Sequence, residues 1–493
     1  MVSRAILNGW PLVPPSKKQA GPSFTVAPSI SGTFASGNTL TLAYTADGFP
    51  AVTASIQWLR DGGYISGATG STYAQTDADV GKTVSAEVRL TNILGYASAK
   101  AAGSVVAQGG GVVPPVDLTN VFNLTASSGA KIKAAVSRAR NSQGLARFLC
   151  QGDSTIFGYG SGFNANFAAY LRQALIANGV PSRFNSWMGT GSQLTNSSYA
   201  DYDGRLSFLS GSAVCSTFAP TVIGQTENVF GGSWIGVSAN GVNFTPSQPF
   251  DRVLVTYQTL AGSFGTGAIS VDSVDLANTI NANTGGALGL GSGLNTCALG
   301  NHTINVRGTG GGGGLRITSI VTWDSTASYV DILQAGVPSS RVAFHNDGAF
   351  GSSPRNATMF GLLNQATGSI PVDVVLLCLT INDSNGGTTV SAWSTAMQSL
   401  INAYLSRGSQ VVLLIGAPSS TAQATNGTLD AYIAEAKTFA TALNLPLFDL
   451  KARWGSYAAS SSKYADTLHP NASGYADWGG WVAETLADFA AAA

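Results

Sequence analysis

Three histidines limit where acid–base hydrolytic chemistry can occur in this chain of 493 residues. Hydrolysis at neutral pH usually uses a base that titrates near the pKa of imidazole. His469 is the strongest candidate. It lies three residues after Asp466 in the run Asp466-Thr467-Leu468-His469-Pro470, just before an amphipathic C-terminal stretch. A carboxylate at this spacing can orient the imidazole and stabilise its protonated form, as in a Ser-His-Asp triad. We expect a hydrogen-bonded structural role for His302. For His345, which precedes a turn sequence, we expect a capping or solvent-facing role.

The candidate nucleophile is Ser154, in the run Gly152-Asp153-Ser154-Thr155-Ile156-Phe157-Gly158. This run follows an apolar strand pattern at 147–150 and precedes a helical pattern at 163–178. Ligands of open α/β sheets gather where strands end, and a serine there can expose its hydroxyl and aim its own N–H at an oxyanion. The alternative is an ordinary turn in which Ser154 caps a helix. The sequence has no Gly-x-Ser-x-Gly elbow, which disfavours the α/β-hydrolase form of this chemistry.

The elements that must position these residues are indicated by two alternating sequence patterns. Continuous apolar runs at 372–379, 410–415 and 446–450 alternate with amphipathic helical patterns at 390–406 and 428–443. Strands that are apolar on both faces and separated by helices predict a parallel sheet covered on both sides. These segments are therefore predicted to belong to an α/β domain.

Other parts of the chain have strand patterns of period two. They predict an N-terminal β-sandwich and a β domain inserted into the α/β domain. The predicted organisation is an N-terminal segment and linker at 1–22, a β-sandwich at 23–108, a linker at 109–127, the first α/β part at 128–212, the inserted β domain at 213–328 and the second α/β part at 329–493.

Composition excludes several functional classes. Lys plus Arg equals Asp plus Glu at 25 each, so the chain lacks the basic surface that nucleic-acid binding requires. Only 10% of the residues are charged and 60 are glycine, which is typical of extracellular or virion-borne β-rich proteins. The N-terminus does not have the pattern of a signal peptide, and no apolar run is long enough to span a membrane.

The four cysteines and the acidic residues give no metal or cofactor pattern. Cys150 and Cys378 lie in apolar runs, where a buried role is expected, whereas a pairing of Cys215 with Cys297 stays open. Neither a His-Glu-x-x-His motif nor a cluster of ligating side chains is present, so no metal and no cofactor are expected.

Taken together, three runs resemble the motif blocks of the SGNH/GDSL hydrolase superfamily over residues 145–490. They are Gly152-Asp153-Ser154, Leu379-Thr380-Ile381-Asn382-Asp383 and the run from Asp466 to Pro470. The resemblance implies a flavodoxin-like three-layer α/β fold with Ser154 as nucleophile, His469 as base and Asp466 as acid. It also implies an oxyanion hole formed by the Ser154 N–H and the Asn382 side chain.

The glycine block of the same resemblance has two candidate positions. The strand-then-glycine pattern at 332–337 favours Gly336 as the third oxyanion donor, with Gly189 or Gly191 as the alternative. The chain departs from the family pattern at Thr380, where the family usually has glycine. This change is expected to narrow the pocket without removing the donor.

A further resemblance concerns the setting. The runs at 57–62 and 76–84 resemble immunoglobulin-like accessory domains of bacterial and phage surface proteins, and the whole arrangement is similar to SGNH proteins of phage tails or spikes and of polysaccharide deacylation. It implies an esterase that removes O-acetyl groups from a bacterial surface polysaccharide, with the inserted β domain at 213–328 binding the carbohydrate. It also implies a location on a virion or outside the cell, with virion or surface proteins as partners and the oligomeric state open. Trp187, Trp234 and Trp323 are candidates for stacking on sugars, although each is more often a core residue.

Two alternatives remain at this level. A secreted lipase or general esterase would use the same catalytic residues and prefer longer acyl chains. A glycan-binding adhesion protein would keep the fold without turnover. The lipase differs from a polysaccharide deacetylase in the ester that it hydrolyses, and the adhesion protein differs in hydrolysing none. The motifs themselves specify only an ester carbonyl.

Overall fold

The computed structural model describes residues 18–106, 116–189, 201–214, 235–284, 289–311, 314–345, 371–420 and 428–492. The chain forms two compact units, Met1–Pro114 and Pro115–Ala493. In the described residues, no helix combines the length and apolar character needed to cross a membrane.

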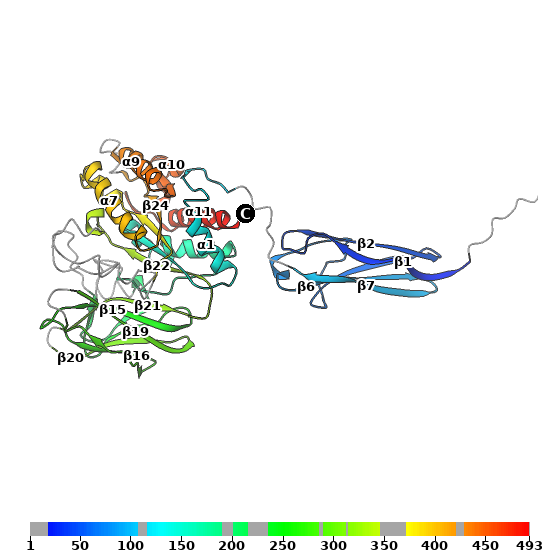
Figure 1. Cartoon of the computed structure of the whole chain (residues 1–493), viewed down its shortest axis with the longest axis horizontal. Coiled ribbons are helices and arrows are strands. Elements are labelled where there is room, and N and C mark those ends of the chain that lie inside the picture. The colour runs from blue at the N-terminus through cyan, green and yellow to red at the C-terminus, as the bar shows by residue number, and fades with distance from the viewer. Residues whose placement is uncertain are drawn as a thin grey trace, which may run out of the picture. The chain divides into compact units, whose positions relative to one another are not determined.

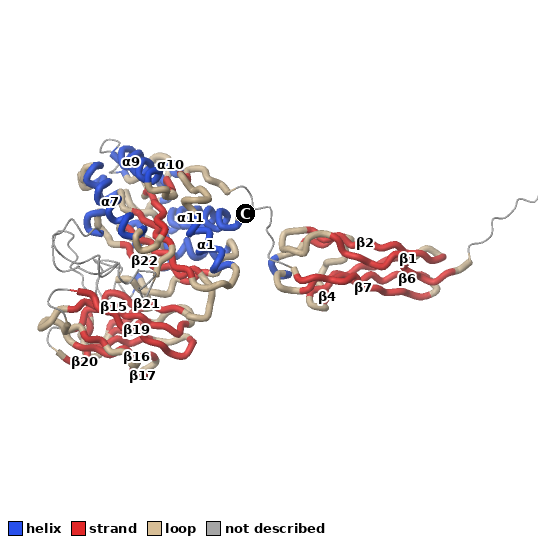
Figure 2. The backbone as a smooth tube through the Cα atoms, in the orientation of Figure 1, coloured by secondary structure: helices blue, strands red, loops and turns tan. Residues whose placement is uncertain are grey.

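The first unit consists almost entirely of antiparallel strands (Figure 2). Its core includes Trp58, Val84, Ala86 and Val88, which are fully buried, and the Trp58 indole donates to the Gly70 carbonyl at 2.9 Å. Buried and exposed residues alternate along β6, as the period-two pattern predicts. One sheet comprises β1 (Ala20–Ser31), β2 (Thr39–Phe49) and β5 (Thr72–Ala74), and the other comprises β4 (Gly63–Tyr64), β3 (Thr53–Arg60), β6 (Thr83–Asn92) and β7 (Gly95–Val105), with a short 3-10 turn η1 at Asp77–Asp79.

The second unit is built on a seven-stranded sheet. All strand pairs in it are parallel except the pair of β25 with β8. Strands β9, β22, β23 and β24 are buried along their whole length, which explains why their sequences are apolar without alternation. In spatial order the strands are β10 (Ser182–Arg183), β22 (Val330–Gly336), β9 (Ala146–Gly152), β23 (Val374–Cys378), β24 (Gln410–Ile415), β25 (Leu447–Asp449) and β8 (Val121–Phe122).

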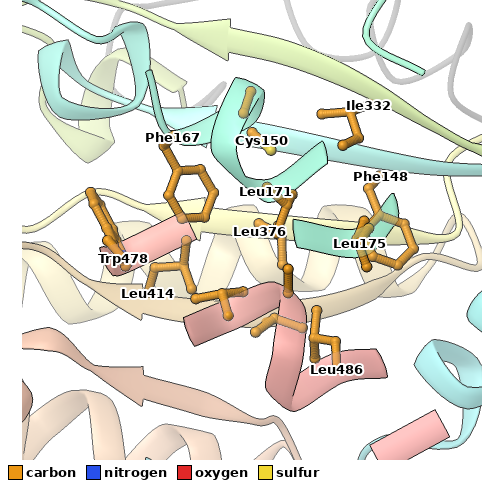
Figure 3. Close-up of a cluster of buried hydrophobic side chains, with 14 of the residues drawn as sticks. Phe148, Cys150, Phe167, Leu171, Leu175, Ile332, Leu376, Leu414, Trp478 and Leu486 are labelled. Atoms are coloured by element: carbon orange, nitrogen blue, oxygen red, sulfur yellow. The ribbon is translucent and has the colours of Figure 1, made fainter. Parts of the chain in front are cut away.

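Helices cover both faces of this sheet (Figure 1). On one face lie α1 (Ala130–Arg140), α3 (Phe167–Ala177) and α11 (Ala472–Ala491), and on the other lie α7 (Val390–Leu405) and α9 (Thr428–Ala442). Figure 3 shows side chains of α3 and α11 packed over the strands: Phe167, Leu171, Leu175, Trp478 and Leu486 with Phe148, Cys150, Leu376 and Leu414.

Short elements connect these layers at the edge of the sheet where the parallel strands end. They are α2 (Ser154–Phe157), α6 (Ile381–Asn385) and α10 (Leu450–Trp454), together with the 3-10 turns η2 (Phe163–Ala165), η3 (Val342–His345) and η4 (Ser461–Lys463). Of these, α2 follows β9 directly and α6 follows β23, so both begin at the same level of the sheet.

A second β body interrupts the α/β unit between β10 and β22. It holds two antiparallel sheets around a shared core that includes Phe244, Val255 and Ile317. One sheet comprises β11 (Leu206–Phe208), β14 (Val242–Phe244), β20 (Ile304–Gly310), β16 (Thr266–Val271), β17 (Val274–Asp275) and β18 (Ile280–Asn281). The other comprises β12 (Ala213–Val214), β13 (Ile235–Val237), β21 (Leu315–Trp323), β15 (Phe250–Thr259) and β19 (Gly289–Gly300).

The edges of this β body differ slightly from the predicted range 213–328. Strand β11 lies before residue 213, yet it pairs with β14 inside the body. The chain leaves the α/β sheet after β10 and returns in β22, and these two strands are paired, with Ser182 opposite Val330. The points of exit and return are therefore close together.

Candidate active site

Ser154 is the first residue of α2, immediately beyond the end of β9. Gly152 makes this turn possible, because a Cβ there would lie 2.5 Å from both the Cys378 carbonyl oxygen and the Ile156 side chain. Asp153 caps the short helix, since its Oδ1 accepts from the backbone N and the Oγ1 of Thr155, both at 2.8 Å. The Ser154 side chain is thereby held at the sheet edge, with 5% of the residue exposed.

His469 lies in a tight loop just ahead of α11. Tyr464 and Pro470 form an isolated bridge across this loop, and the Ala465 N–H donates to the His469 carbonyl at 2.8 Å. Asn471 then caps α11 by accepting from the Gly474 N–H at 3.0 Å. This arrangement places His469 Nε2 2.9 Å from Ser154 Oγ.

Asp466 holds the other side of the imidazole. Its Oδ2 lies 2.8 Å from His469 Nδ1, and its Oδ1 accepts from the backbone N–H groups of Leu468 and His469, both at 2.7 Å. Burial alone would raise the pKa of Asp466, but the hydrogen bonds from His469 and Leu468 lower it below its usual value. An ionised Asp466 fixes the proton on Nδ1, which leaves Nε2 free to accept the Ser154 proton.

Asn382 is the second residue of α6 and is half-buried. Its Nδ2 donates to the Ser340 carbonyl at 3.0 Å. Because Cys378 at the end of β23 is paired with Gly152 at the end of β9, Asn382 and Ser154 follow neighbouring strands at one edge of the sheet. Thr380, the residue at which the sequence departs from the family pattern, is buried directly before α6.

Gly336 is the last residue of β22 and is paired with Gly152. A Cβ at Gly336 would lie 2.3 Å from the Phe157 backbone nitrogen, so close packing against α2 explains the glycine. The neighbouring Val337 N–H is the one that donates to the Gly152 carbonyl, at 2.9 Å. An oxyanion role for Gly336 stays a prediction. Of the alternatives, Gly189 is buried with φ of 72°, and Gly191 lies outside the described residues.

The other two histidines have different environments. His302 lies between β19 and β20, and its ring nitrogens lie 2.6 Å from Asp272 Oδ2 and 2.9 Å from the Ala298 carbonyl, so the expected hydrogen-bonded role is observed. The expectation for His345 is wrong: this residue is 5% exposed and lies inside a hydrogen-bonded cluster. One of its partners, Gln151, is 194 positions away in the sequence, so the adjoining turn sequence could not reveal its burial.

Burial changes the titration of two carboxylates beside the site. Removal from water raises the pKa of Asp153 to about 6, against the opposing hydrogen bonds from Thr155. Removal from water likewise raises the pKa of Asp383 to about 6, although its Oδ2 accepts from the Val342 N–H at 2.8 Å. Through these hydrogen bonds Asp153 braces the turn that carries Ser154, and Asp383 braces the loop beside Asn382.

Tyr159 is a residue of the site that the motifs did not indicate. Its ring centroid lies 4.6 Å from that of His469, and 46% of the residue is exposed. The glycines at 158 and 160, both with positive φ, shape the loop that presents it. A signal for it was available, because an aromatic residue between two glycines directly follows the nucleophile's helix.

The tryptophans proposed for sugar stacking are placed differently. Trp187 is 1% exposed and belongs to the core of the inserted β body. Trp323 is partly buried, with the Arg147 guanidinium carbon 4.9 Å from its ring centroid. Trp234 lies outside the described residues, as does Cys215, so the pairing of Cys215 with Cys297 stays a prediction.

Comparisons with known proteins bear on the family and the fold of the α/β unit. Residues 303–476 match the model of the GDSL-like lipase/acylhydrolase family, a range that includes Asn382, Asp466 and His469 but begins after Ser154. No curated protein matches the sequence significantly.

Among solved structures, a peptidoglycan O-acetylesterase matches with a TM-score of 0.53 at 15% identity, over 76% of this chain and 100% of that one. A protein from Bacillus subtilis matches with a TM-score of 0.28 at 14% identity, over 56% of this chain and 85% of that one. A family two carbohydrate esterase from Clostridium thermocellum matches with a TM-score of 0.22 at 11% identity, over 51% of this chain and 93% of that one. The family match and the first of these structures together support the SGNH hydrolase fold, of the GDSL-like lipase/acylhydrolase type, for the α/β unit of this chain.

Proposed function

We propose that this protein is a serine esterase that removes O-acetyl groups from a bacterial surface polysaccharide, with Ser154, His469 and Asp466 as its catalytic triad. The observation that carries the proposal is the continuous pair of hydrogen bonds from Ser154 Oγ to His469 Nε2 at 2.9 Å and from His469 Nδ1 to Asp466 Oδ2 at 2.8 Å. This geometry suits acyl transfer through a covalent intermediate.

In the first half of the reaction, Ser154 Oγ forms a bond to the acetyl carbonyl carbon while His469 Nε2 takes the serine proton. The C–O bond to the sugar then breaks, and His469 returns the proton to the departing sugar oxygen. In the second half, water attacks the acetyl-enzyme, His469 takes a proton from that water, and acetate leaves as Ser154 regains its hydrogen. Asp466 stabilises the imidazolium that forms twice in this cycle.

The developing oxyanion needs hydrogen-bond donors fixed in advance. The donors that we propose are the N–H of Ser154 and the side-chain amide of Asn382, with the Gly336 N–H as the third. The positions of Ser154 and Asn382 beyond the paired ends of β9 and β23 support the first two. No metal or cofactor takes part in the proposed reaction.

Two observations favour a saccharide as the leaving group. One is that a solved structure similar to this chain, with a TM-score of 0.53, is a peptidoglycan O-acetylesterase. The other is the exposed ring of Tyr159 beside His469, because an aromatic face can pack against the C–H face of a sugar while its hydroxyl remains in water. A lipase would instead require a long apolar groove for the acyl chain.

The test is acetate release from nitrophenyl acetate and from acetylated peptidoglycan or another O-acetylated polysaccharide, with the wild type and Ser154→Ala. We expect release from both substrates by the wild type and a loss of at least ~1,000-fold in the variant. Equal rates in the two proteins would refute the triad. A preference for long-chain nitrophenyl esters would favour the lipase, and binding of polysaccharide without acetate release would favour the adhesion protein.

We further propose that the protein acts on a virion or at a cell surface, because its low charge and high glycine content are typical of such proteins. Immunoblotting of purified particles and of cell-surface and cytosolic fractions tests this location. Recovery in the cytosolic fraction alone would contradict it.

A further inference from the structure

We propose that His345 is a positioning residue of the oxyanion hole, which acts through Ser340 to fix the orientation of the Asn382 amide. This inference rests on the proposed esterase function. The evidence for it is a chain of hydrogen bonds that begins on α7, passes through β9 and ends at Asn382. This chain of hydrogen bonds is separate from the proposed triad.

The chain begins at Tyr404 on α7, whose hydroxyl donates to Gln151 Oε1 on β9. The Gln151 amide nitrogen lies 3.0 Å from His345 Nδ1. An amide nitrogen can only donate, so His345 Nδ1 accepts and the ring proton of the neutral imidazole is on Nε2. His345 Nε2, at 2.9 Å from Ser340 Oγ, therefore donates to that hydroxyl.

Ser340 connects the hydrogen-bonded His345 to the side chain of Asn382. Its carbonyl accepts from Asn382 Nδ2 at 3.0 Å. A carbonyl can only accept, so this contact requires the nitrogen of the Asn382 amide, rather than its oxygen, to face the loop. One amide N–H is held in this way, and the second N–H of the same nitrogen is the one that can reach an oxyanion beside Ser154.

The loop that carries Ser340 is held from several sides. The Val337 N–H donates to the Gly152 carbonyl at 2.9 Å, and the Ser340 N–H donates to the Val337 carbonyl at 3.1 Å. The Val342 N–H donates to Asp383, the residue next to Asn382. Ser339 has φ of 62°, a left-handed conformation that a serine adopts at a cost. The loop is thus clamped between β9 and α6, with His345 filling its interior.

Because its side chains are buried, this chain of hydrogen bonds favours one arrangement of the loop. Gln151, Ser340, His345 and Tyr404 are 3%, 1%, 5% and 1% exposed. Polar side chains at this depth cost free energy unless their partners are in place, so the network favours one arrangement of the loop over others. An apolar cluster of the same volume would fill the space but would not dictate which atom of Asn382 faces Ser340.

The first experiment measures kcat and KM for nitrophenyl acetate in His345→Phe and Ser340→Ala. We expect kcat to fall by at least ~10-fold in each, with KM within about 2-fold of wild type, because an oxyanion donor acts on the transition state. Ser340→Thr keeps the hydroxyl and should retain most of kcat. The matched control is His302→Gln, which removes a histidine that is also bonded through both ring nitrogens but lies in the inserted β body; its kcat should be that of wild type.

The second experiment is a double-mutant cycle with Asn382→Ala. If His345 acts through Asn382, His345→Phe will reduce kcat by less than ~2-fold in the Asn382→Ala background. An undiminished loss in that background would overturn the proposal, as would wild-type kcat in both His345→Phe and Ser340→Ala. A fall in kcat that merely follows the unfolded fraction, measured by circular dichroism at the assay temperature, would also overturn it. Failure of the esterase proposal is recognised separately, because Ser154→Ala would then release acetate as fast as the wild type.

Discussion

Ser154 Oγ and His469 Nε2 lie 2.9 Å apart although 315 positions separate them in the chain. One follows β9, the third of the seven strands of the sheet, and the other precedes the last helix. The helices beside them pack closely: the Phe167 ring of α3 and the Trp478 ring of α11 have centroids 4.7 Å apart, and a Cβ at Gly479 would lie 2.9 Å from the Leu171 nitrogen. The distance between the Ser154 hydroxyl and the His469 imidazole therefore depends on how α11 packs against α3.

Replacement of Asp466 tests the orientation of the imidazole. In Asp466→Asn the side chain is neutral and can no longer balance the positive charge of protonated His469. An amide nitrogen facing Nδ1 would also favour the tautomer with its proton on Nε2, which cannot accept the Ser154 proton. We expect kcat for nitrophenyl acetate to fall by at least ~100-fold with little change in KM. The control is Asp275→Asn, which removes a carboxylate paired with Arg307 in the inserted β body. An Asp466→Asn variant with more than half of the wild-type kcat would show that Asp466 is not the triad acid.

Replacement of Tyr159 tests the leaving group. In Tyr159→Leu the exposed ring beside His469 is lost, so we expect KM for an O-acetylated polysaccharide to rise by about 10-fold, on the scale of ~1–1.5 kcal/mol for an aromatic contact. The value of kcat/KM for nitrophenyl acetate should stay within about 2-fold of wild type. Tyr159→Phe keeps the ring and serves as the control. Equal losses on both substrates in Tyr159→Leu would indicate that the ring supports His469 rather than a sugar.

Two glycine substitutions should have opposite effects on stability. Gly336→Ala places a Cβ 2.3 Å from the Phe157 nitrogen, so it should lower the free energy of unfolding by ~1–3 kcal/mol or more as α2 is displaced. Gly480→Ala, on α11, meets no atom within 4 Å and should stabilise the helix by roughly 0.5–1 kcal/mol. Thermal and urea denaturation measure both. An unchanged stability of Gly336→Ala would contradict the observed packing of β22 against α2.

The buried carboxylate of Asp153 predicts an unusual pH dependence of stability. Its pKa is raised from 3.8 to about 6, so between these values the folded state holds a proton that the unfolded state has lost. The contribution of protonated Asp153 to the free energy of unfolding is therefore fully present below pH ~4. It falls as pH rises and is lost above pH ~6.

Asp153→Asn removes this titration and keeps an oxygen acceptor for Thr155. The free energy of unfolding of the variant relative to wild type should increase by up to about 3 kcal/mol between pH 4 and pH 7, at roughly 1.4 kcal/mol per pKa unit. Urea denaturation at a series of pH values measures the difference. A difference that does not vary with pH would mean that Asp153 titrates alike in the folded and unfolded states.

Long elements with a strong periodic pattern could be predicted from the sequence. The apolar run at 410–415 has the bounds of β24, and the helical pattern at 390–406 differs from α7 by one residue at its end. Short elements could not: β11 has three residues and β8 has two, too few to establish a period. These strands exist because a neighbouring strand supplies their hydrogen bonds.

The residues of the proposed triad could likewise be selected from the sequence, because residue type and local spacing single out Ser154, Asp466 and His469, which the structure brings into hydrogen-bonding contact. The sequence could not reveal what holds the residues around them. His345 becomes buried only when β9, α7 and the loop after β22 meet, and Gly336 must be glycine only because α2 packs against it. Both facts depend on contacts between segments that are far apart in the chain.

The place where the inserted β body joins the sheet has an evolutionary consequence. One of its two junctions follows β10, and the other precedes β22. Ser154 follows β9, Asn382 follows β23, and His469 lies in the loop before α11. A recombination event that exchanges everything between these junctions would leave the catalytic residues on their own supports. The body could therefore be replaced by a module of another kind without changing the strands and the loop that hold Ser154, Asn382 and His469 in place.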